Sequence, residues 1–288
     1  MDQLTWLVTG CSSGFGRAFV LAILAKGDRV IATARSKDQS AAERLADLKA
    51  SGAAVMEVDV TWSRETLDQK AKEAWSIYGS VDVLVNNAAY IDTECCEEID
   101  EPFVRTMKNN TLGPMNLTPA FLPYMRERRK GTLIFMSSGP SCTPALYAVA
   151  YSSSKALLES IVATLGAEIE PFGLRTSVLV PGHFRTSVLS PGNVLYNRSL
   201  NPVPACDEMR KSTRDLYDAF DGARPGDPRK AAELVVEAVR GEGRCKEKSL
   251  PAWLPLGADA FEWAEKWCRG KLDACEEWRD LACDTALD

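Results

Sequence analysis

The 288-residue chain has the composition of a globular protein, with 45% hydrophobic and 26% charged residues. These proportions exclude a disordered or fibrous class. The formal net charge is -6, and Lys and Arg are dense only across residues 126–130. Because phosphate backbones are bound by clustered cations, nucleic acid is not expected as a partner.

A cytoplasmic location without a membrane segment is expected. No run approaches the roughly 20 apolar residues that cross a bilayer, and a strand predicted from Leu4 leaves no space for a cleavable signal. The nine cysteines form no C-x-x-C pair, and His183 is the one histidine. We therefore predict reduced thiols and no metal site.

Apolar runs alternate with segments of helical periodicity along the first two thirds of the chain. The predicted strands are residues 5–9, 29–34, 54–58, 81–86, 132–136 and 176–180. The predicted helices are residues 16–26, 41–50, 65–78, 101–129 and 151–170, the fourth being either two helices or one helix bent near Gly113–Pro114. This alternation predicts an α/β single-domain Rossmann fold: a doubly wound parallel sheet of about seven strands flanked by helices, with its ligand at the carboxyl ends of the strands.

The pattern changes after Pro181. We expect one domain (1–288) with a cofactor-binding and catalytic core at 1–186, a substrate lid at 187–228 and a helical C-terminal extension at 245–288. Helices are predicted at 207–220 and 228–240. The extension holds four tryptophans: Trp253, Trp263, Trp267 and Trp278. The favoured interpretation is a helix packed on the core, and the alternative is a wall of the substrate pocket or a subunit contact.

A glycine-rich turn joins the first predicted strand to the first predicted helix. Residues 9–16 read T-G-C-S-S-G-F-G, in the pattern T-G-x-x-x-G-x-G. The first glycine permits a tight turn, the second lets phosphate approach the backbone, and the third allows close helix packing. Helix-start amides then face the pyrophosphate of a dinucleotide, although an ordinary strand-to-helix turn is the alternative. The predicted contacts are Thr9, Gly10, Ser12, Ser13, Gly14, Phe15 and Gly16.

This spacing resembles the fingerprint of the short-chain dehydrogenase/reductase family. Further matching motifs follow in order: Asp59-Val60, Asn86-Asn87-Ala88, Asn110, Ser138, Tyr151-x-x-x-Lys155, and Pro181-Gly182 with Thr186. The resemblance implies an adenine pocket at Asp59 and Val60 and a ribose border at Asn87. It also implies cofactor contacts at Ala88, Pro181 and Gly182. It further implies a bond from Thr186 to the nicotinamide carboxamide. One departure is Ala89, where the family usually has glycine.

The end of the second predicted strand bears on cofactor choice. An acid there would bind the adenosine ribose hydroxyls and repel a 2′-phosphate, whereas a guanidinium can hold that phosphate. Ala34 occupies the position of the acid, and Arg35 follows it. We expect NADP(H) in preference to NAD(H), with a solvated surface cation as the alternative for Arg35.

Four residues form the expected catalytic group: Asn110, Ser138, Tyr151 and Lys155. Tyr151 and Lys155 are four residues apart in a predicted helix, so they share one face, and a nearby cation lowers the pKa of a phenol. The resemblance implies that Lys155 also holds the nicotinamide ribose, that Ser138 stabilises the oxyanion, and that Asn110 anchors a water. Tyr147 is a rival proton donor, but no lysine stands four residues after it.

The predicted function is that of an NADPH-dependent oxidoreductase. Hydride would pass between the nicotinamide and a carbonyl or secondary alcohol, with Tyr151 as general acid or base. The chain resembles ketoreductase-type members, and its aromatic extension suits a bulky apolar substrate. Alternatives are a catalytically silent NADP(H)-binding sensor or scaffold, or an enzyme of epimerisation or reductive cyclisation. The resemblance also implies a homo-oligomer, dimer or tetramer, formed through helices 101–129 and 151–170.

Overall fold

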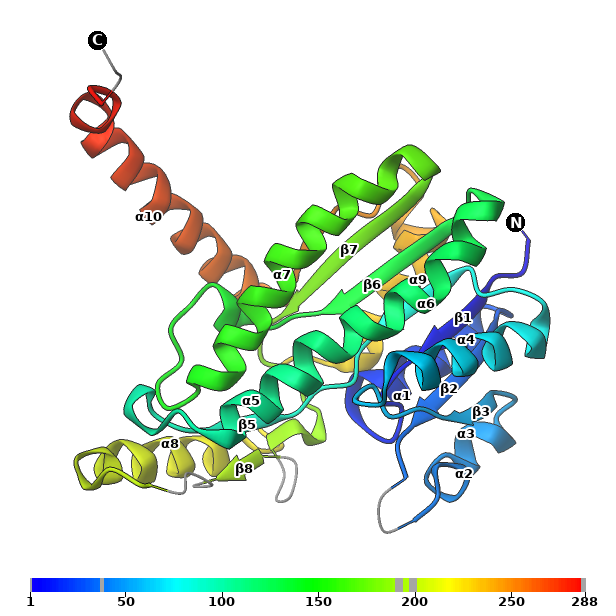
Figure 1. The fold of residues 1–288 in the computed structure, drawn as a ribbon, viewed down its shortest axis with the longest axis horizontal. Helices are drawn as coiled ribbons and strands as arrows, with labels where there is room; N and C mark the ends of the chain where they lie inside the picture. The colour runs from blue at the N-terminus through cyan, green and yellow to red at the C-terminus, as the bar shows by residue number, and fades with distance from the viewer. Residues whose placement is uncertain (1, 37–38, 190–193, 197–200, 286–288) are drawn as a thin grey trace.

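The computed structural model describes residues 2–36, 39–189, 194–196 and 201–285. Parts of the expected lid and the last three residues of the extension lie outside this range. Seven parallel strands form the main sheet in the order β3-β2-β1-β4-β6-β7-β9 (Figure 1). Their bounds are β1 Thr5–Val8, β2 Arg29–Ala34, β3 Ala54–Glu57, β4 Val83–Asn86, β6 Gly131–Met136, β7 Leu174–Pro181 and β9 Trp253–Leu256. The Rossmann-type doubly wound sheet predicted from the sequence is confirmed.

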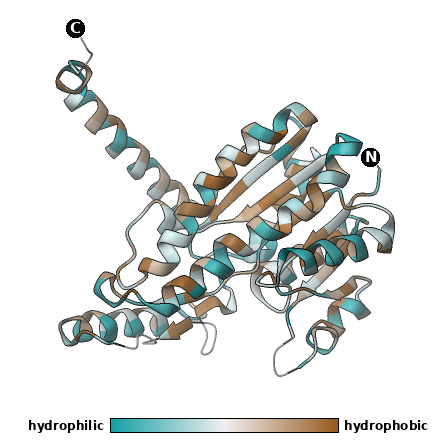
Figure 2. Cartoon of the chain, in the orientation of Figure 1, coloured by the Kyte–Doolittle hydropathy of each residue, from teal (hydrophilic) through white to brown (hydrophobic). Residues whose placement is uncertain are grey.

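Helices cover both faces of this sheet. Alternate residues of β1 point to opposite faces: Trp6 and Val8 belong to the core under α1 (Gly14–Ala25) and α9 (Pro228–Arg240). Leu7 belongs to the second core, under α4 (Arg64–Tyr78), α6 (Gly113–Arg128) and α7 (Val149–Ile169). Figure 2 shows the corresponding apolar strands between helices with mixed faces. Because both faces are covered, the strands read as continuous apolar runs rather than as alternating ones.

Two helical predictions needed refinement. Residues 41–50 form two short helices, α2 (Ala41–Arg44) and α3 (Ala46–Ala50), which meet at Leu45. The long segment 101–129 is divided as well, into α5 (Glu101–Met107) and α6, with a π-helical turn at Lys108–Leu112 between them. The division next to Gly113–Pro114 agrees with the two-helix alternative.

The seventh strand, β9, did not appear among the predicted strand segments. It lies at the edge of the sheet, where it pairs with β7 only. Pro255 lies within it. Proline has no N–H to donate, and this is tolerated in an edge strand because the side of the strand that faces solvent has no neighbouring strand to bond. Trp253, which the sequence placed with the aromatic extension, is therefore a strand residue.

A small second sheet supports the segment expected to act as a lid. β5 (Ile91–Thr93) pairs in parallel with β8 (Val194–Tyr196), and α8 (Asp207–Phe220) follows. Ile91, Leu189 and Val194 form a small core that also contacts Tyr151 and Tyr217. This layer therefore packs directly beside the predicted catalytic tyrosine.

The C-terminal helix α10 (Ala258–Cys283) differs most from expectation. Only its beginning packs on the body, through Ala260 and Ala264, and residues 265–285 are exposed. Figure 1 shows α10 projecting from the rest of the chain. The favoured prediction of a helix packed on the core was wrong beyond the first two turns, because the apolar side chains after Ala264 are exposed to solvent in the described structure.

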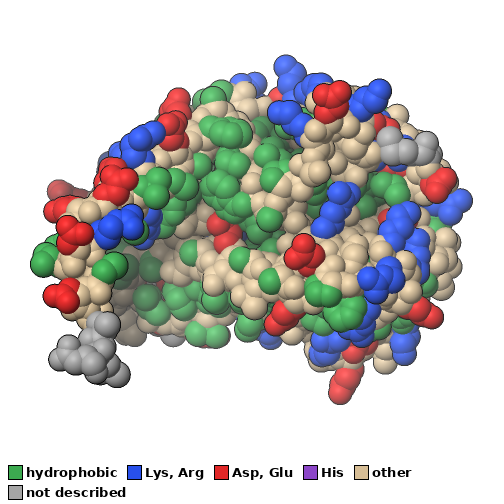
Figure 3. Space-filling view, turned by 90° about the horizontal axis from the view of Figure 1, so that it is seen from above, with side chains coloured by type: hydrophobic (Ala, Val, Ile, Leu, Met, Phe, Trp, Pro, Cys, Tyr) green, Lys and Arg blue, Asp and Glu red, His purple; other side chains and the backbone are tan. Residues whose placement is uncertain are grey.

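The helices were compared with the requirements of a membrane span, and the surface was viewed for its distribution of charged and apolar side chains. No helix in the described ranges combines the length and apolarity needed to span a bilayer. On the face seen in Figure 3, hydrophobic side chains gather over the middle, and basic side chains are interspersed with acidic ones.

Candidate active site

A cavity of about 1280 Å³ opens at the carboxyl ends of the central strands. It exceeds the usual volume of a small-ligand pocket and can hold a dinucleotide together with a substrate. Most of the predicted site residues line it: Gly10, Ser12, Ser13, Gly14, Phe15, Arg35, Asp59, Val60, Asn87, Ala88, Ser138, Tyr151, Lys155, Pro181, Gly182 and Thr186. Thr9, Gly16 and Asn110 are not among the lining residues and lie behind the wall.

The glycine-rich turn is held by close backbone contacts. Gly10 has a φ of +70°, and a Cβ there would lie 2.9 Å from the Ala88 Cα. A Cβ on Gly16 would lie 2.3 Å from the Gly10 carbonyl oxygen. The Thr9 hydroxyl accepts hydrogen bonds from the backbone amides of Asn87 (2.9 Å) and Ala88 (3.0 Å). Thr9 and Gly16 thus shape the turn from behind, whereas Gly10, Ser12, Ser13, Gly14 and Phe15 face the cavity.

The start of α1 fits an anionic group. Ser13 is the N-cap residue, yet its side chain makes no capping hydrogen bond, and the neighbouring Gly14 and Phe15 line the cavity. Free amides at a helix start, with the positive end of the helix dipole, bind phosphate. These residues and the glycine cradle fit the pyrophosphate of a dinucleotide.

Two arginines stand at the far end of the cavity. Arg35 is exposed and follows β2, as the sequence indicated. Arg44 in α2 also lines the cavity, and it donates to the Arg35 carbonyl (2.7 Å) and the Ser12 hydroxyl (3.0 Å). The sequence reasoning did not single out Arg44, since its place depends on how α2 folds back over the turn. Two guanidinium groups therefore border one end of the cavity.

The predicted acid–base pair lies at the middle of the cavity. Burial raises the pKa of Tyr151, and a hydrogen bond with the Ser138 side chain opposes that rise. The Lys155 ammonium lies 5.8 Å from the centroid of the Tyr151 ring and donates to the Met136 carbonyl (2.8 Å). The expected lowering of the Tyr151 pKa by Lys155 is thus not found in the chain alone, because the ammonium lies over the ring and bonds elsewhere.

Lys155 is itself perturbed. Burial lowers its pKa to about 8, and the carboxylate of Glu159 opposes this fall. Glu159 lies one helical turn after Lys155, accepts a hydrogen bond from the Trp253 indole (2.9 Å), and also accepts one from the Ser137 hydroxyl. It links α7 to β9 and to the residue before Ser138. The sequence reasoning missed Glu159, although its i+4 spacing from the lysine was visible.

Asn110 is fully buried in the π-helical turn. Its side chain donates to the Tyr90 carbonyl (3.0 Å) and to the Ser154 hydroxyl (3.2 Å), and accepts from the Tyr90 amide (3.2 Å). It therefore connects the loop before β5 to α7 and does not face the cavity. Turns of π-helix are frequent at functional sites.

The remaining wall of the cavity is largely apolar. It includes Leu195, Leu216, Tyr217, Phe220 and Trp263. Trp263, in the first turns of α10, packs so closely on Gly139 that a Cβ there would lie 2.3 Å from its ring. The alternative prediction for the extension, a pocket wall, therefore holds for Trp263.

The anchor of α10 is polar. The Asp259 carboxylate accepts a hydrogen bond from the His183 backbone amide (2.6 Å), and its Oδ2 atom lies 3.0 Å from Nδ1 of the His183 ring. His183 in turn packs edge-on against Trp263 with ring centroids 5.0 Å apart. These contacts fix the position of Trp263 beside the cavity.

Fold and site together define a dinucleotide-binding class of protein with a Rossmann-type sheet. The profile of the family described as short chain dehydrogenase matches residues 5–193. The chain belongs to the short-chain dehydrogenase/reductase family, a family of oxidoreductases.

Proteins similar to this chain match it over nearly its whole length. It is 30% identical to oxidoreductase BOA17 of Botryotinia fuckeliana, with 98% of each chain covered. A solved short-chain dehydrogenase of Streptomyces avermitilis is similar with a TM-score of 0.83 and 35% identity, with 99% of each chain covered. A short chain dehydrogenase of Burkholderia cenocepacia in complex with NADP shares the fold, with a TM-score of 0.68 and 22% identity, over 96% of this chain and 97% of that one.

Proposed function

We propose that the protein is an NADPH-dependent reductase of ketones or aldehydes, or the reverse alcohol dehydrogenase. The observation that carries the proposal is that Ser138, Tyr151 and Lys155 line the same cavity as the glycine-rich turn. Arg35 and Arg44, the paired arginines, line this cavity too. Bound NADPH supplies the hydride. The proposal for NADP over NAD rests on Arg35 and Arg44 of this chain, since the likeness to the NADP-bound Burkholderia protein concerns the fold.

The side chains of the site have distinct tasks. The Ser138 hydroxyl donates a hydrogen bond to the carbonyl oxygen of the substrate and stabilises the charge that develops there. Tyr151 gives its phenolic proton to the same oxygen. The place of the Lys155 ammonium next to the Tyr151 ring suits it to orient the nicotinamide ribose. If the ammonium exchanges its bond to the Met136 carbonyl for one to Tyr151, it also stabilises the phenolate that remains. Asn110 holds this frame through Ser154 and Tyr90.

A screen of carbonyl compounds, followed by the loss of NADPH absorbance, tests the proposed function. We expect consumption of NADPH only when a carbonyl substrate is present, with the alcohol as product. A protein that binds NADPH but reduces no member of a broad ketone and aldehyde set would support the sensor or scaffold alternative. Products with an inverted centre or a new ring would support epimerisation or reductive cyclisation.

The apolar wall indicates a bulky apolar substrate. Replacing Trp263 with Ala removes an aromatic face from the cavity, so we expect KM for a bulky ketone to rise about tenfold, as for the loss of a buried aromatic contact. KM for NADPH should stay unchanged. Phe261→Ala is the matched control, because Phe261 lies in the same turn of α10 and is 56% exposed. Equal effects of the two substitutions would show that Trp263 acts only through the stability of α10.

The carboxylate of Glu159 should affect how the activity depends on pH. Its charge raises the pKa of buried Lys155, which stands at about 8; Glu159→Gln should therefore lower that pKa. Because the charged lysine is the active form, kcat/KM for reduction should begin its alkaline fall at a lower pH, by on the order of one unit.

Profiles of kcat/KM against pH for both forms check this expectation. Glu168→Gln, on the exposed side of the same helix, should leave the profile unchanged. A uniform loss of activity at every pH, without displacement of the alkaline limb, would show that Glu159 serves structure alone.

Three further expectations stay proposals. The first is that residues 187–228 act as a substrate lid. This proposal is supported by the side chains of α8 that line the cavity. The homo-oligomer forms through residues 101–129 and 151–170. In this region α6 and α7 line a groove with residues such as Met115, Ile161 and Leu165. The cytoplasmic location would be tested by cell fractionation, and the oligomer by sedimentation of the purified protein.

A further inference from the structure

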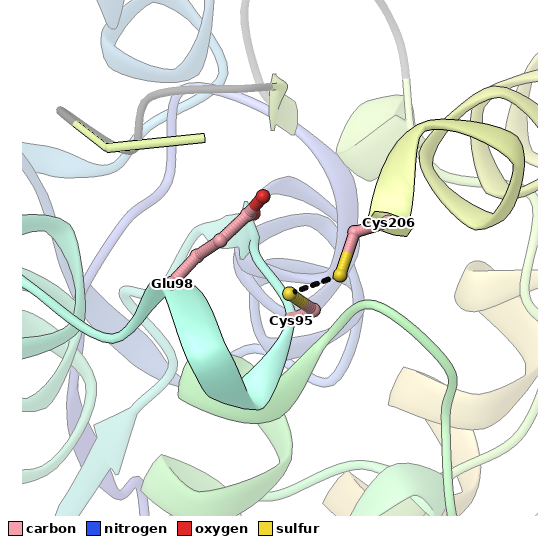
Figure 4. Close-up of side chains that lie close together, drawn as sticks. All are labelled: Cys95, Glu98 and Cys206. Atoms are coloured by element: carbon pink, nitrogen blue, oxygen red, sulfur yellow. Dashed lines mark hydrogen bonds between the residues drawn. The ribbon is translucent and has the colours of Figure 1, made fainter. Parts of the chain in front are cut away.

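Two cysteines far apart in the sequence meet beneath the α8 layer. Cys95 follows β5, and Cys206 ends a short 3-10 turn, Pro204–Cys206, immediately before α8. Their sulfur atoms lie 2.7 Å apart, and both residues are buried (Figure 4). This separation approaches the sulfur–sulfur distance of a disulfide, about 2.05 Å, although 111 positions separate the two residues.

The segments that carry the two cysteines are held together at a second point. Glu98, three residues after Cys95, accepts hydrogen bonds from the Val203 amide (2.9 Å) and the Tyr147 hydroxyl (3.1 Å). It also forms a buried ion pair with Arg210 of α8. The pairing of the cysteines is thus built into the packing and is not a chance approach of two mobile side chains.

A metal ion is the competing occupant. Cys95, Glu98 and Cys206 place one ligand atom each within 4.8 Å of one another. However, the Glu98 carboxylate already accepts three hydrogen bonds and is neutralised by Arg210. A structural zinc site needs four ligands. The cluster, as described, offers two thiols and an occupied carboxylate, which favours oxidation over metal binding.

We propose that Cys95 and Cys206 are a redox modification site, whose disulfide covalently ties α8 to the core beside the cavity. The oxidant is a small disulfide such as oxidised glutathione. The Cys95 thiolate attacks it, forms a mixed disulfide and releases one glutathione; Cys206 then attacks the Cys95 sulfur and releases the second. The two protein thiols lose two protons and two electrons, and the oxidant is reduced to two thiols.

The position of the bond gives it a consequence for the site. Thr213, Leu216, Tyr217 and Phe220 of α8 line the cavity, and Cys206 lies directly before this helix. A bond at its start would hold the apolar wall in place and would be lost under reducing conditions. The bond itself does not depend on the proposed function; only its effect on turnover does.

The test uses the full chain with its four exposed cysteines replaced by serine: Cys96, Cys268, Cys275 and Cys283. This protein is treated with oxidised glutathione, digested without reduction, and analysed by mass spectrometry. We expect a species that joins the peptides containing Cys95 and Cys206, with two hydrogen atoms lost. Because both cysteines are intact in this protein, the result does not depend on whether a variant of the pair folds.

Thermal unfolding without cofactor gives the second measurement. A disulfide that closes a long loop should raise Tm by on the order of 5 °C, and a reducing agent should reverse the rise. In the same background, Cys206→Ser should show no such response, whereas Cys245→Ser, which removes another buried cysteine, should keep it.

Three outcomes would overturn the proposal. The first is that both thiols stay free, or carry glutathione without closing the bond, at saturating oxidant. The second is that the linked peptides form without any change in Tm. The third is that the untreated protein, equilibrated with Zn²⁺ and dialysed, retains one ion for each chain and loses it on Cys95→Ser. None of these three measurements involves a carbonyl substrate, so their failure is distinct from failure of the proposed function.

Discussion

Replacing Tyr151 with Phe should reduce turnover by about 10²- to 10⁴-fold, the contribution usual for a positioned proton donor. The substitution removes one hydroxyl from the cavity wall and leaves the ring that packs against the small core of Ile91, Leu189 and Val194. Lys155, the glycine turn and the paired arginines remain, so the affinity for NADPH should be nearly unchanged. Steady-state kinetics with the best carbonyl substrate, together with NADPH titration, measure the two effects separately.

Tyr147→Phe is the control for this experiment. Tyr147 also carries a hydroxyl, but that group bonds Glu98 and Arg210 and is not among the residues that line the cavity. Its loss should leave turnover largely intact. If Tyr151→Phe retained turnover and Tyr147→Phe lost it, Tyr147 would be the proton donor. That result would refute the mechanism.

Replacing Arg35 with Asp should reverse the cofactor preference. The change removes a guanidinium and places a carboxylate where the 2′-phosphate of NADPH is expected. Loss of a charge-assisted hydrogen bond and gain of repulsion predict a rise in KM for NADPH on the order of 10²-fold. NADH carries no such phosphate and should bind at least as well, because the new carboxylate can accept from its ribose hydroxyls.

Arg44 extends this prediction to a residue that only the structure reveals. Arg44→Ala should weaken the binding of NADPH about tenfold more than the binding of NADH. It should not bring the improved binding of NADH that is expected for Arg35→Asp. Arg64→Ala, an exposed arginine paired with Asp68 on α4, is the control for a general loss of positive charge. Wild-type protein that prefers NADH would contradict the assignment of both arginines.

The parts of the fold that follow from local patterns were predictable. Buried strands of a parallel sheet are continuous apolar runs, and the turn at Gly10 requires a residue that tolerates positive φ, so both leave marks in the sequence. The edge strand β9 left no such mark, because Pro255 reads as a strand breaker unless the open edge is known. The exposure of α10 after Ala264 was likewise not predictable, since its aromatic residues suggest burial.

The site divides in the same way. Tyr151 and Lys155 are neighbours on one helix, so their spacing alone places them together. Arg44 and Trp263 reach the cavity only through tertiary packing, from α2 and from the start of α10. The sequence places Lys155 near Tyr151, but it gives neither the burial that raises the pKa of Tyr151 nor the hydrogen bond of Lys155 to Met136.

The most direct test of the central claim follows the hydride itself. NADPH that carries deuterium at the transferable position of the nicotinamide is incubated with the protein and its best carbonyl substrate, and the alcohol is analysed by mass spectrometry. We predict one deuterium on the carbinol carbon for each NADPH consumed. An alcohol without deuterium, or NADPH consumed without any alcohol, would contradict the assignment of this chain as a carbonyl reductase.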